Sequence, residues 1–470
     1  MPFHIRGIIE GFYGEPWTHA NRLSLVDWMA ELGFNYLVYS PKDDPYHRVW
    51  WERLYPAGKL AELEELATKA RERGIRLCYA LAPGLSICYA DPQSVERITA
   101  KLGQLYEIGI RDFGLFFDDI PTSLDPESER RFGTFAAAQA HVTNEVVALM
   151  KERDPELSFT FCPTHYHGDP DHPYLHELGE KLDPAVMVYW TGPRICSETI
   201  PKEDAQRFAA VLRRKPLYWD NYPVNDAAMV GELHIRPYRG RDPALEELAE
   251  GIVLNPMPLF EASKFALATA ARYLDDPMGY DPEEAFEWAL GKLGFSEELK
   301  TAWRFLADTV WLSPLEGEDR SRFSQTVAEA VALVRDLKPS EAVQRLTALF
   351  QSGKEAVARI RLDGEQKALA AEVEPWLAEL EAWCDLGLAV VRLMQELFGR
   401  AEGEELHMGD ASLQALVATI KERLRQSVDF TTHACGNAVA NLARDIVVRL
   451  NAQAARGIVP EPADEEGAGA

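Results

Sequence analysis

The feature of this chain that most limits its fold is a series of eight short apolar runs within roughly its first 275 residues. Between the runs lie stretches whose apolar residues recur at helical spacing. Nearly continuous apolar strands are typical of parallel sheets that helices cover. We therefore predict strands at residues 5–9, 35–40, 76–81, 113–117, 158–162, 186–190, 216–219 and 251–254.

The spacing of these runs favours a closed barrel. Their ends follow one another at intervals of roughly 35 residues, which is the size of one strand-plus-helix unit. Thr18 is a suitable N-cap, and Gly33 a suitable end, for the helix between the first two runs. A doubly wound open sheet is the alternative, but no G-x-G-x-x-G follows the first run. We predict an α/β fold with a (β/α)₈ TIM-like barrel at residues 1–285.

The pattern changes after about residue 290, where strand signals stop. Residues 340–361, 366–397 and 412–451 carry apolar residues at helical spacing and contain few prolines. This pattern predicts an all-α helical bundle at residues 286–456. Residues 457–470 are rich in Pro, Glu, Ala and Gly, which predicts a disordered tail.

Charge and composition exclude several classes of partner. The chain of 470 residues has 49 Lys+Arg against 75 Asp+Glu, a net charge of −26, which repels nucleic acid and anionic lipid. No segment has 18 consecutive apolar residues, and the N-terminus has no apolar signal region, so we expect a cytoplasmic protein. The six cysteines lie far apart without a C-x-x-C pair, which argues against structural zinc and a disulfide framework.

Polar and aromatic residues follow most of the predicted strands. In a β/α barrel these positions gather at one face, where reactive groups lie. Any single one is explained by a turn or a helix cap, but Lys, Tyr, Trp and paired carboxylates are not turn residues. Aromatic rings combined with amides and carboxylates suit a sugar. The segments concerned are 10–14, 41–44, 116–119, 162–166, 190–193, 219–221, 225–226 and 255–256.

The adjacent carboxylates of Asp118 and Asp119 are the most informative pair. Two neighbouring carboxylates repel each other, so one is expected to hold its proton more tightly than the other. Such a pair can donate a proton to a glycosidic oxygen and stabilise positive charge. The same residues could instead cap a helix, or ligate Mg²⁺ or Zn²⁺.

The metal alternative has local support from the loop 165–172, which holds three histidines and two aspartates. A His-x-His pair can bind zinc. Metal-dependent barrels usually draw their ligands from several strand ends, whereas this cluster lies on one polar loop. We therefore favour a solvated rim for this loop.

Several of these segments together resemble glycoside hydrolase family 84, which contains the O-GlcNAcases and their bacterial relatives. The matching motifs appear in the family's order over roughly 250 residues, at the expected strand ends. Residues beyond the barrel are similar to the family's helical stalk only in a general way. The motifs are GIIEGFYGEPW at 7–17, SPKDD at 40–44, FFDD at 116–119, CPTHY at 162–166, WTGP at 190–193, WDN at 219–221 and GIVLNP at 251–256.

The resemblance implies a retaining exo-β-N-acetylglucosaminidase that uses no metal or other cofactor. The substrate's own 2-acetamido oxygen then acts as nucleophile and forms an oxazoline. By the motif match, Asp118 accepts a hydrogen bond from the acetamido N–H, and Asp119 serves as general acid and then general base. Tyr166 would bind the acetamido oxygen. The methyl pocket would be shaped by Cys162, Thr191 and Trp219, and the sugar hydroxyls held by the Gly11 backbone, Lys42, Asn221, Asp226 and Asn255.

Two other functions stay open at this point. One is a metal-dependent barrel hydrolase that uses Asp118, Asp119 and the loop 165–172. The other is a non-catalytic glycan-binding protein. With the family resemblance we expect a GlcNAc-bearing glycan or glycoprotein as partner and allow a homodimer formed through the helical region.

Overall fold

The computed structural model describes residues 3–311, 313, 315, 319–398 and 411–456, the last six of these by their backbone only. The predicted tail at 457–470 lies outside the described residues. The described chain forms two compact units. The first contains residues 3–230, 234–294, 313 and 315, and the second contains residues 231–233, 295–311 and the described residues from 319 onward.

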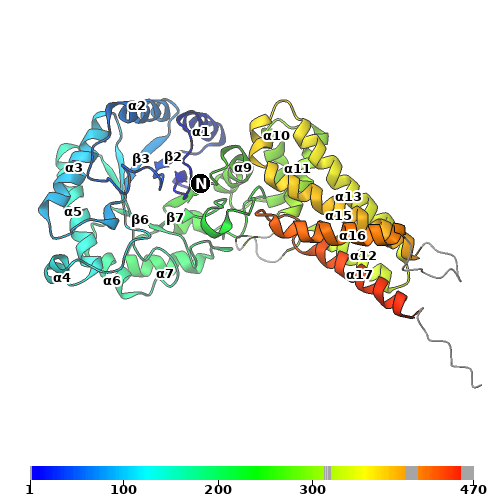
Figure 1. Cartoon of the computed structure of the whole chain (residues 1–470). Coiled ribbons are helices and arrows are strands. Elements are labelled where there is room, and N and C mark those ends of the chain that lie inside the picture. The colour runs from blue at the N-terminus through cyan, green and yellow to red at the C-terminus, as the bar shows by residue number, and fades with distance from the viewer. Residues whose placement is uncertain (1–2, 312, 314, 316–318, 399–410, 457–470) are drawn as a thin grey trace, which may run out of the picture. The chain divides into compact units, whose positions relative to one another are not determined.

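The first unit is a closed barrel of eight parallel strands in sequence order (Figure 1). Because β1 pairs with β8, the sheet has no free edge, and the open-sheet alternative is wrong. All eight predicted strands are confirmed. The strands are β1 (Ile5–Glu10), β2 (Tyr36–Tyr39), β3 (Arg76–Leu81), β4 (Asp112–Phe116), β5 (Ser158–Cys162), β6 (Met187–Trp190), β7 (Pro216–Asp220) and β8 (Gly251–Leu254).

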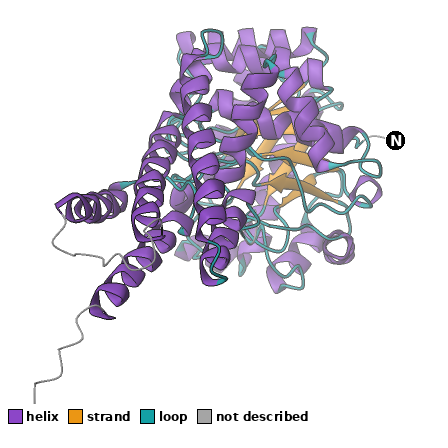
Figure 2. Ribbon diagram, turned by 90° about the vertical axis from the view of Figure 1, so that its right-hand side faces the viewer, coloured by secondary structure: helices purple, strands orange, loops and turns teal. Residues whose placement is uncertain are grey.

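Helices surround these strands, as the turned view in Figure 2 shows. The first begins as predicted, because the Thr18 side chain accepts a hydrogen bond from the Asn21 N–H at 3.1 Å, and it ends at Gly33 in the left-handed conformation. The helices are α1 (His19–Leu32), α2 (Ala57–Glu72), α3 (Pro92–Glu107), α4 (Pro126–Phe132), α5 (Phe135–Arg153), α6 (Pro173–Lys181), α7 (Lys202–Leu212), α8 (Leu245–Leu248), α9 (Phe260–Asp275) and α10 (Pro282–Lys292), with short 3₁₀ turns η1 (Pro83–Leu85) and η2 (Ala227–Met229).

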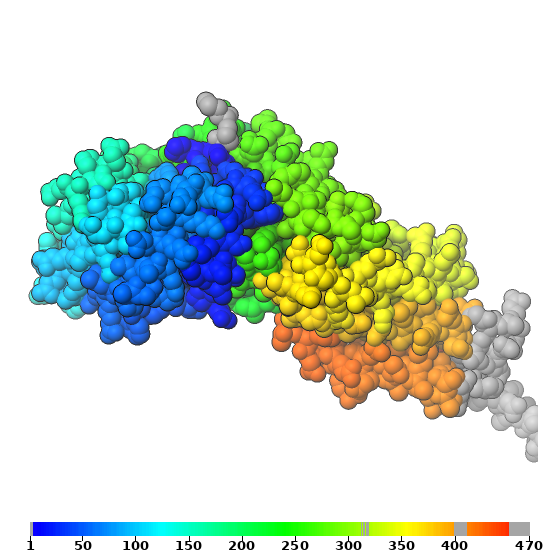
Figure 3. Space-filling model, turned by 90° about the horizontal axis from the view of Figure 1, so that it is seen from above, coloured from blue at the N-terminus to red at the C-terminus, as the bar shows by residue number. Residues whose placement is uncertain are grey.

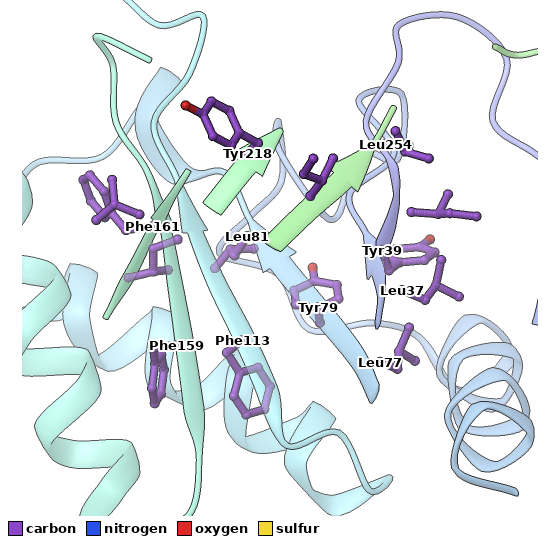
Figure 4. Packing of buried hydrophobic residues seen from close by; sticks show 14 of the residues in the cluster. Leu37, Tyr39, Leu77, Tyr79, Leu81, Phe113, Phe159, Phe161, Tyr218 and Leu254 are labelled. Atoms are coloured by element: carbon purple, nitrogen blue, oxygen red, sulfur yellow. The ribbon is translucent and has the colours of Figure 1, made fainter. Parts of the chain in front are cut away.

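The strands are apolar on both faces because each face packs against a different core. Alternate residues such as Leu37, Phe113 and Phe161 belong to the large cluster that includes the surrounding helices (Figure 4). The residues between them, including Val38 and Cys162, belong to a second, smaller cluster. Since side chains alternate along a strand, this second cluster fills the inside of the barrel. Its last layer lies at the carboxyl ends of the strands.

The second unit is helical, as predicted. Helix α13 packs against α11, α12 and α15, and α15 packs against α16 and α17. Figure 3 shows the outer surface of these helices in yellow to orange. No described helix is long and apolar enough to cross a lipid bilayer. The elements are α11 (Glu297–Thr309), α12 (Arg322–Arg335), α13 (Pro339–Leu362), α14 (Lys367–Glu372), α15 (Glu374–Phe398), α16 (Ala411–Gln426), η3 (Ser427–Asp429) and α17 (Ala438–Arg456).

Two of the segments with apolar residues at helical spacing, 366–397 and 412–451, each contain two helices in the structure. The first is interrupted at Val373, between α14 and α15, because Pro375, the second residue of α15, lacks the N–H that a continuing helix needs. The second is interrupted between α16 and α17, where Cys435 and Gly436 both have positive φ. Local backbone chemistry therefore overrides the helical periodicity at both places.

Helices α13 and α15 pack too closely for a side chain at Gly387. A Cβ atom there would lie 2.4 Å from two Phe350 ring atoms. We expect Gly387→Ala to lower the free energy of unfolding by about 1–3 kcal/mol, because the ring must move within a filled core. Urea denaturation followed by circular dichroism measures this change. Gly364→Ala is the matched control, since nothing lies within 4 Å of its added Cβ, and equal midpoints for the two variants would contradict the prediction.

Candidate active site

A cavity of about 220 Å³ opens at the carboxyl ends of the strands. All eleven residues predicted for the site line it, together with five that were not predicted. Seven of the eight strands, all but β3, supply these residues from their last positions or the loops that follow. The lining consists of Gly11, Tyr13, Lys42, Asp118, Asp119, Cys162, Tyr166, Thr191, Ile195, Cys196, Trp219, Asn221, Val224, Asp226, Ala227 and Asn255.

The indole of Trp219 forms a fixed apolar wall of this cavity. It belongs to the inner cluster of the barrel and is 5% exposed. Its Nε1 donates to Asn221 Oδ1 at 3.0 Å, and the Lys42 ammonium lies 5.2 Å from a ring centroid. A Cβ atom on Gly11 would come within 2.4 Å of the indole. The indole therefore occupies the space that any larger residue at position 11 would need.

Asp118 is buried directly after β4 and forms an ion pair with Lys42. The ammonium contacts only one carboxylate oxygen, Oδ2. The other oxygen, Oδ1, is buried and has no hydrogen-bond partner within the described chain. An unsatisfied buried acceptor is costly, so this oxygen is suited to accept a hydrogen bond from a ligand N–H or O–H in the cavity.

Asp119 has different surroundings, although it is the next residue. Its backbone has a φ of 52°, in the left-handed region that Asp tolerates better than most residues. Its Oδ2 accepts from the Tyr13 hydroxyl at 2.8 Å, and its Oδ1 accepts from the Tyr166 hydroxyl at 2.7 Å. Burial, together with the nearby carboxylates, raises the pKa of both phenols, so both remain hydrogen-bond donors.

The helix-cap alternative for the two aspartates is wrong. The next helix along the chain, α4, begins at Pro126, and its N-cap is Asp125. The two carboxylates therefore serve the cavity rather than a helix end.

Polar groups that follow β1, β7 and β8 are held by hydrogen bonds in the lining of the cavity. The Gly11 N–H donates to Asn255 Oδ1 at 3.2 Å, and Asn255 Nδ2 donates to Asn221 Oδ1 at 2.9 Å. The Tyr13 N–H donates to Asp226 Oδ2 at 2.7 Å. Burial raises the pKa of the Asp226 carboxyl above its ordinary value. These contacts orient the amides and the carboxylate before any ligand binds.

Cys162 and Thr191 line the cavity together with Tyr166. Burial raises the pKa of the Cys162 thiol, which keeps it neutral. The Thr191 hydroxyl donates to the Arg194 carbonyl at 2.8 Å, and the Thr191 N–H donates to the Tyr166 carbonyl at 2.9 Å. Because the Thr191 hydroxyl is already hydrogen-bonded, its methyl group is the part of the side chain that can contact an apolar part of a ligand.

The loop 165–172 does not gather metal ligands. The rings of His165 and His172 stack in parallel, with centroids 4.1 Å apart, instead of directing their nitrogens at a common point. His172 caps α6 by accepting from the Tyr174 N–H at 3.3 Å, and His176 pairs with Asp171 at 2.7 Å. Within the described ranges, no group of three or more His, Cys, Asp or Glu side chains is placed to hold a metal ion.

Sequence reasoning missed two residues that contact Asp119. Tyr13 lies inside the first motif, but nothing in the motif indicates that its hydroxyl reaches Asp119. Arg48 lies in the loop after β2 and donates to the Asp119 carbonyl at 2.8 Å. Both contacts join residues from different strand ends, and no local pattern carries that information.

Comparisons with known proteins agree with this geometry. The sequence model of the family described as beta-N-acetylglucosaminidase matches residues 6–308. The Protein O-GlcNAcases of Rattus norvegicus and Mus musculus are each 37% identical over 278 residues. That stretch is 58% of this chain but only 30% of the rat and mouse proteins.

Similarity to a solved structure extends over nearly the whole chain. An O-GlcNAc hydrolase from Thermobaculum terrenum, solved as an Asp-to-Asn mutant, superposes with a TM-score of 0.92 at 32% identity. The match covers 97% of this chain and 98% of that one. Fold and site thus define a barrel glycoside hydrolase. The chain belongs to the β-N-acetylglucosaminidase family, glycoside hydrolase family 84, which confirms the resemblance seen in its motifs.

The close approach of Gly11 to Trp219 allows a test of whether this cavity is the ligand site. We expect Gly11→Ala to weaken binding of N-acetylglucosamine about tenfold or more, because the added Cβ must push the indole into the cavity. Isothermal titration calorimetry measures the affinity. Gly58→Ala is the control, since its added Cβ meets nothing within 4 Å, and wild-type affinity in the Gly11 variant would contradict the assignment of the ligand site.

Proposed function

We propose that this chain is a retaining exo-β-N-acetylglucosaminidase of the O-GlcNAcase type. It would release terminal β-linked GlcNAc, including GlcNAc on Ser or Thr of glycoproteins. The observation that carries the proposal is the contrast between the two aspartates. Asp118 is paired with Lys42 and keeps one buried oxygen unpartnered, whereas both oxygens of Asp119 contact phenols. The Thermobaculum terrenum O-GlcNAc hydrolase supports the same reaction.

The first step breaks the glycosidic bond with help from the substrate. The 2-acetamido oxygen attacks C1 and forms a new C–O bond, while the bonding electrons of the old C1–O bond move to the leaving oxygen. Asp119 gives that oxygen its proton, and the sugar becomes a positively charged oxazoline (an oxazolinium ion) that keeps the N–H of its acetamido group. Asp118 Oδ1 accepts a hydrogen bond from the acetamido N–H, and its negative charge stabilises the positive charge that develops there. Proton transfer of this kind is worth roughly 10²–10⁴-fold.

The second step reverses the roles. The Asp119 carboxylate takes a proton from water, whose oxygen attacks C1, and the C1–O bond of the oxazolinium ring breaks, which restores the neutral acetamide. Two displacements at C1 leave its configuration unchanged, so the β-anomer of GlcNAc is the first product. Tyr166 would donate to the acetamido oxygen, and Cys162, Thr191 and Trp219 would enclose the methyl group. Holding the nucleophile in place gives an intramolecular advantage.

The remaining groups would bind the sugar hydroxyls. We assign this role to the Gly11 backbone, Lys42, Asn221, Asp226 and Asn255, all of which line the cavity. The cavity of about 220 Å³ is smaller than the roughly 300–1,000 Å³ that is typical of larger ligands. This size supports recognition of a single terminal sugar.

We also retain the expected homodimer and the cytoplasmic location as proposals. An apolar groove between α12 and α17, lined in part by Val327, Val331 and Leu442, supports an interface on the helical unit. The protein-bound aglycone is likewise part of the proposal.

Asparagine variants separate the two proposed roles. We expect Asp119→Asn to lower kcat about 10²–10⁴-fold on substrates with poor leaving groups and less on 4-nitrophenyl β-GlcNAc, which needs little protonation. Asp118→Asn should lower kcat on both substrates, because oxazoline formation loses its stabilising charge. Steady-state kinetics measure these effects. Asp27→Asn, on the outer helix α1, is the control, and wild-type turnover in both active-site variants would refute the mechanism.

Chelation tests the metal-dependent alternative. After exhaustive treatment with EDTA, we expect full release of 4-nitrophenol from 4-nitrophenyl β-GlcNAc, because protein groups alone supply acid, base and charge stabilisation. Loss of activity that Zn²⁺ or Mg²⁺ restores would favour the metal enzyme. Binding of GlcNAc without any release of 4-nitrophenol would favour a glycan-binding protein.

A further inference from the structure

The Arg48 side chain is linked by hydrogen bonds to both the backbone carbonyl and the carboxyl group of Asp119. The side chain is buried, with 7% of the residue exposed, in the loop that follows β2. Its Nη1 donates to the Tyr13 hydroxyl at 2.9 Å, and its Nη2 donates to the Asp119 carbonyl at 2.8 Å. The Tyr13 hydroxyl in turn lies 2.8 Å from Asp119 Oδ2. One guanidinium therefore contacts the backbone of Asp119 directly and its carboxyl group through a single phenol.

We propose that Arg48 is a positioning residue for the Asp119 carboxyl group, that it acts through Tyr13, and that this contact places the acid proton on Oδ1. The proposal rests on the function proposed above. Within that function, Oδ1 of Asp119 delivers the proton to the leaving group, and Arg48 and Tyr13 determine that Oδ1 rather than Oδ2 carries it.

The direction of the hydrogen bonds follows from the donors present. A guanidinium can only donate, so the Tyr13 oxygen accepts from Arg48. The single hydroxyl hydrogen of Tyr13 then points to Asp119 Oδ2, which must accept it. Burial raises the pKa of Tyr13, so this hydrogen is retained. Because Oδ2 accepts the hydrogen of the Tyr13 hydroxyl, the acid proton is disfavoured on Oδ2. Oδ1 is therefore the oxygen that carries it.

The contact at Oδ1 is compatible with a proton there. Tyr166 lies 2.7 Å from this oxygen, and within the described part of the chain no guanidinium contacts its hydroxyl to fix the direction of the hydrogen bond. Its hydroxyl can donate to an ionised Asp119 or, when its hydrogen is given to the acetamido oxygen, accept from a protonated one. Oδ1 is thus able to hold the proton before transfer and to receive one from water afterwards.

The backbone contact has a separate effect. Asp119 has a φ of 52°, a conformation that side chains with a Cβ rarely adopt. The hydrogen bond from Arg48 Nη2 to its carbonyl holds the peptide in this conformation. Without it, the peptide can relax and turn the carboxyl group away from the cavity.

Other titratable and charged groups also face Asp119, and they contribute to any pH profile that is measured for the enzyme. Asp118 precedes it in the chain and is paired with Lys42. The charge of Asp119 also acts on groups from the loops after β5 and β7. The titratable and charged groups concerned are Tyr13, Lys42, Arg48, Asp118, Cys162, Tyr166, His167 and Asp226. Of these, only Arg48 and Tyr13 change in the test below.

The test is the pH profile of kcat/KM for Tyr13→Phe and Arg48→Met. Both variants remove stabilisation of the ionised carboxylate, so the acid keeps its proton to higher pH. We expect the alkaline limb of the profile to move up by about one pH unit, the size of a hydrogen bond to a charged group. On 4-methoxyphenyl β-GlcNAc, whose leaving group needs protonation, kcat/KM should fall about tenfold more than on 4-nitrophenyl β-GlcNAc.

A double variant tests whether Arg48 acts through Tyr13. If it does, combining Tyr13→Phe with Arg48→Met should cost less than the product of the two single losses. Tyr106→Phe and Arg97→Met, on helix α3 away from the cavity, are the matched controls and should leave the profile unchanged. Should Arg48→Met fail to fold, Arg48→Lys replaces it, because a single ammonium does not reproduce the two-pronged contact.

The outcomes separate this inference from the proposed function. An unmoved alkaline limb with equal losses on both substrates would show that Arg48 only supports its loop, which overturns the inference. Strictly multiplicative losses in the double variant would overturn the action through Tyr13. Wild-type turnover in both Asp119→Asn and Asp118→Asn would instead overturn the proposed function itself.

Discussion

Pairing of β1 with β8 is the constraint on which the rest of the first unit depends. It closes the parallel sheet and brings the ends of the first and last strands together. As a result, the Gly11 N–H reaches the Asn255 side chain, although 244 positions separate them in the chain. Every strand then ends at the same rim, and residues from seven strand ends share one small cavity. An open sheet would leave the same residues spread along an edge.

The cavity gives different surroundings to two neighbouring carboxylates. Asp118 is buried against an ammonium, while Asp119 lies in the open part of the site between two phenols. The peptide between them is short, so this separation requires an unusual backbone, and the positive φ of Asp119 supplies it. Two consecutive residues can thus provide two carboxyl groups with different roles, one that stabilises charge and one that gives and takes a proton.

Much of the fold could be read from the sequence because its signals are local. Apolar runs, the cap at Thr18 and the stop at Gly33 each depend on a few consecutive residues. The segments that hold the site were found because they follow strands, whereas the individual site residues were assigned through the resemblance to the family's motifs. The divided helices of the second unit show the limit of periodicity, since one proline at 375 outweighs a long apolar pattern. The contacts of Asp119 with Tyr13 and Arg48 span 106 and 71 positions, and no spacing within the chain encodes them.

The absence of a side chain at Gly11 has a consequence for redesign of the enzyme. Because the indole of Trp219 fills the space that a Cβ would need, neither residue can grow without displacing the other. If the N-acyl group binds as proposed, room for longer acyl chains must therefore come from Cys162 and Thr191, whose side chains are small and also line the cavity. Variant libraries for this purpose would keep Gly11 and Trp219 constant and vary positions 162 and 191.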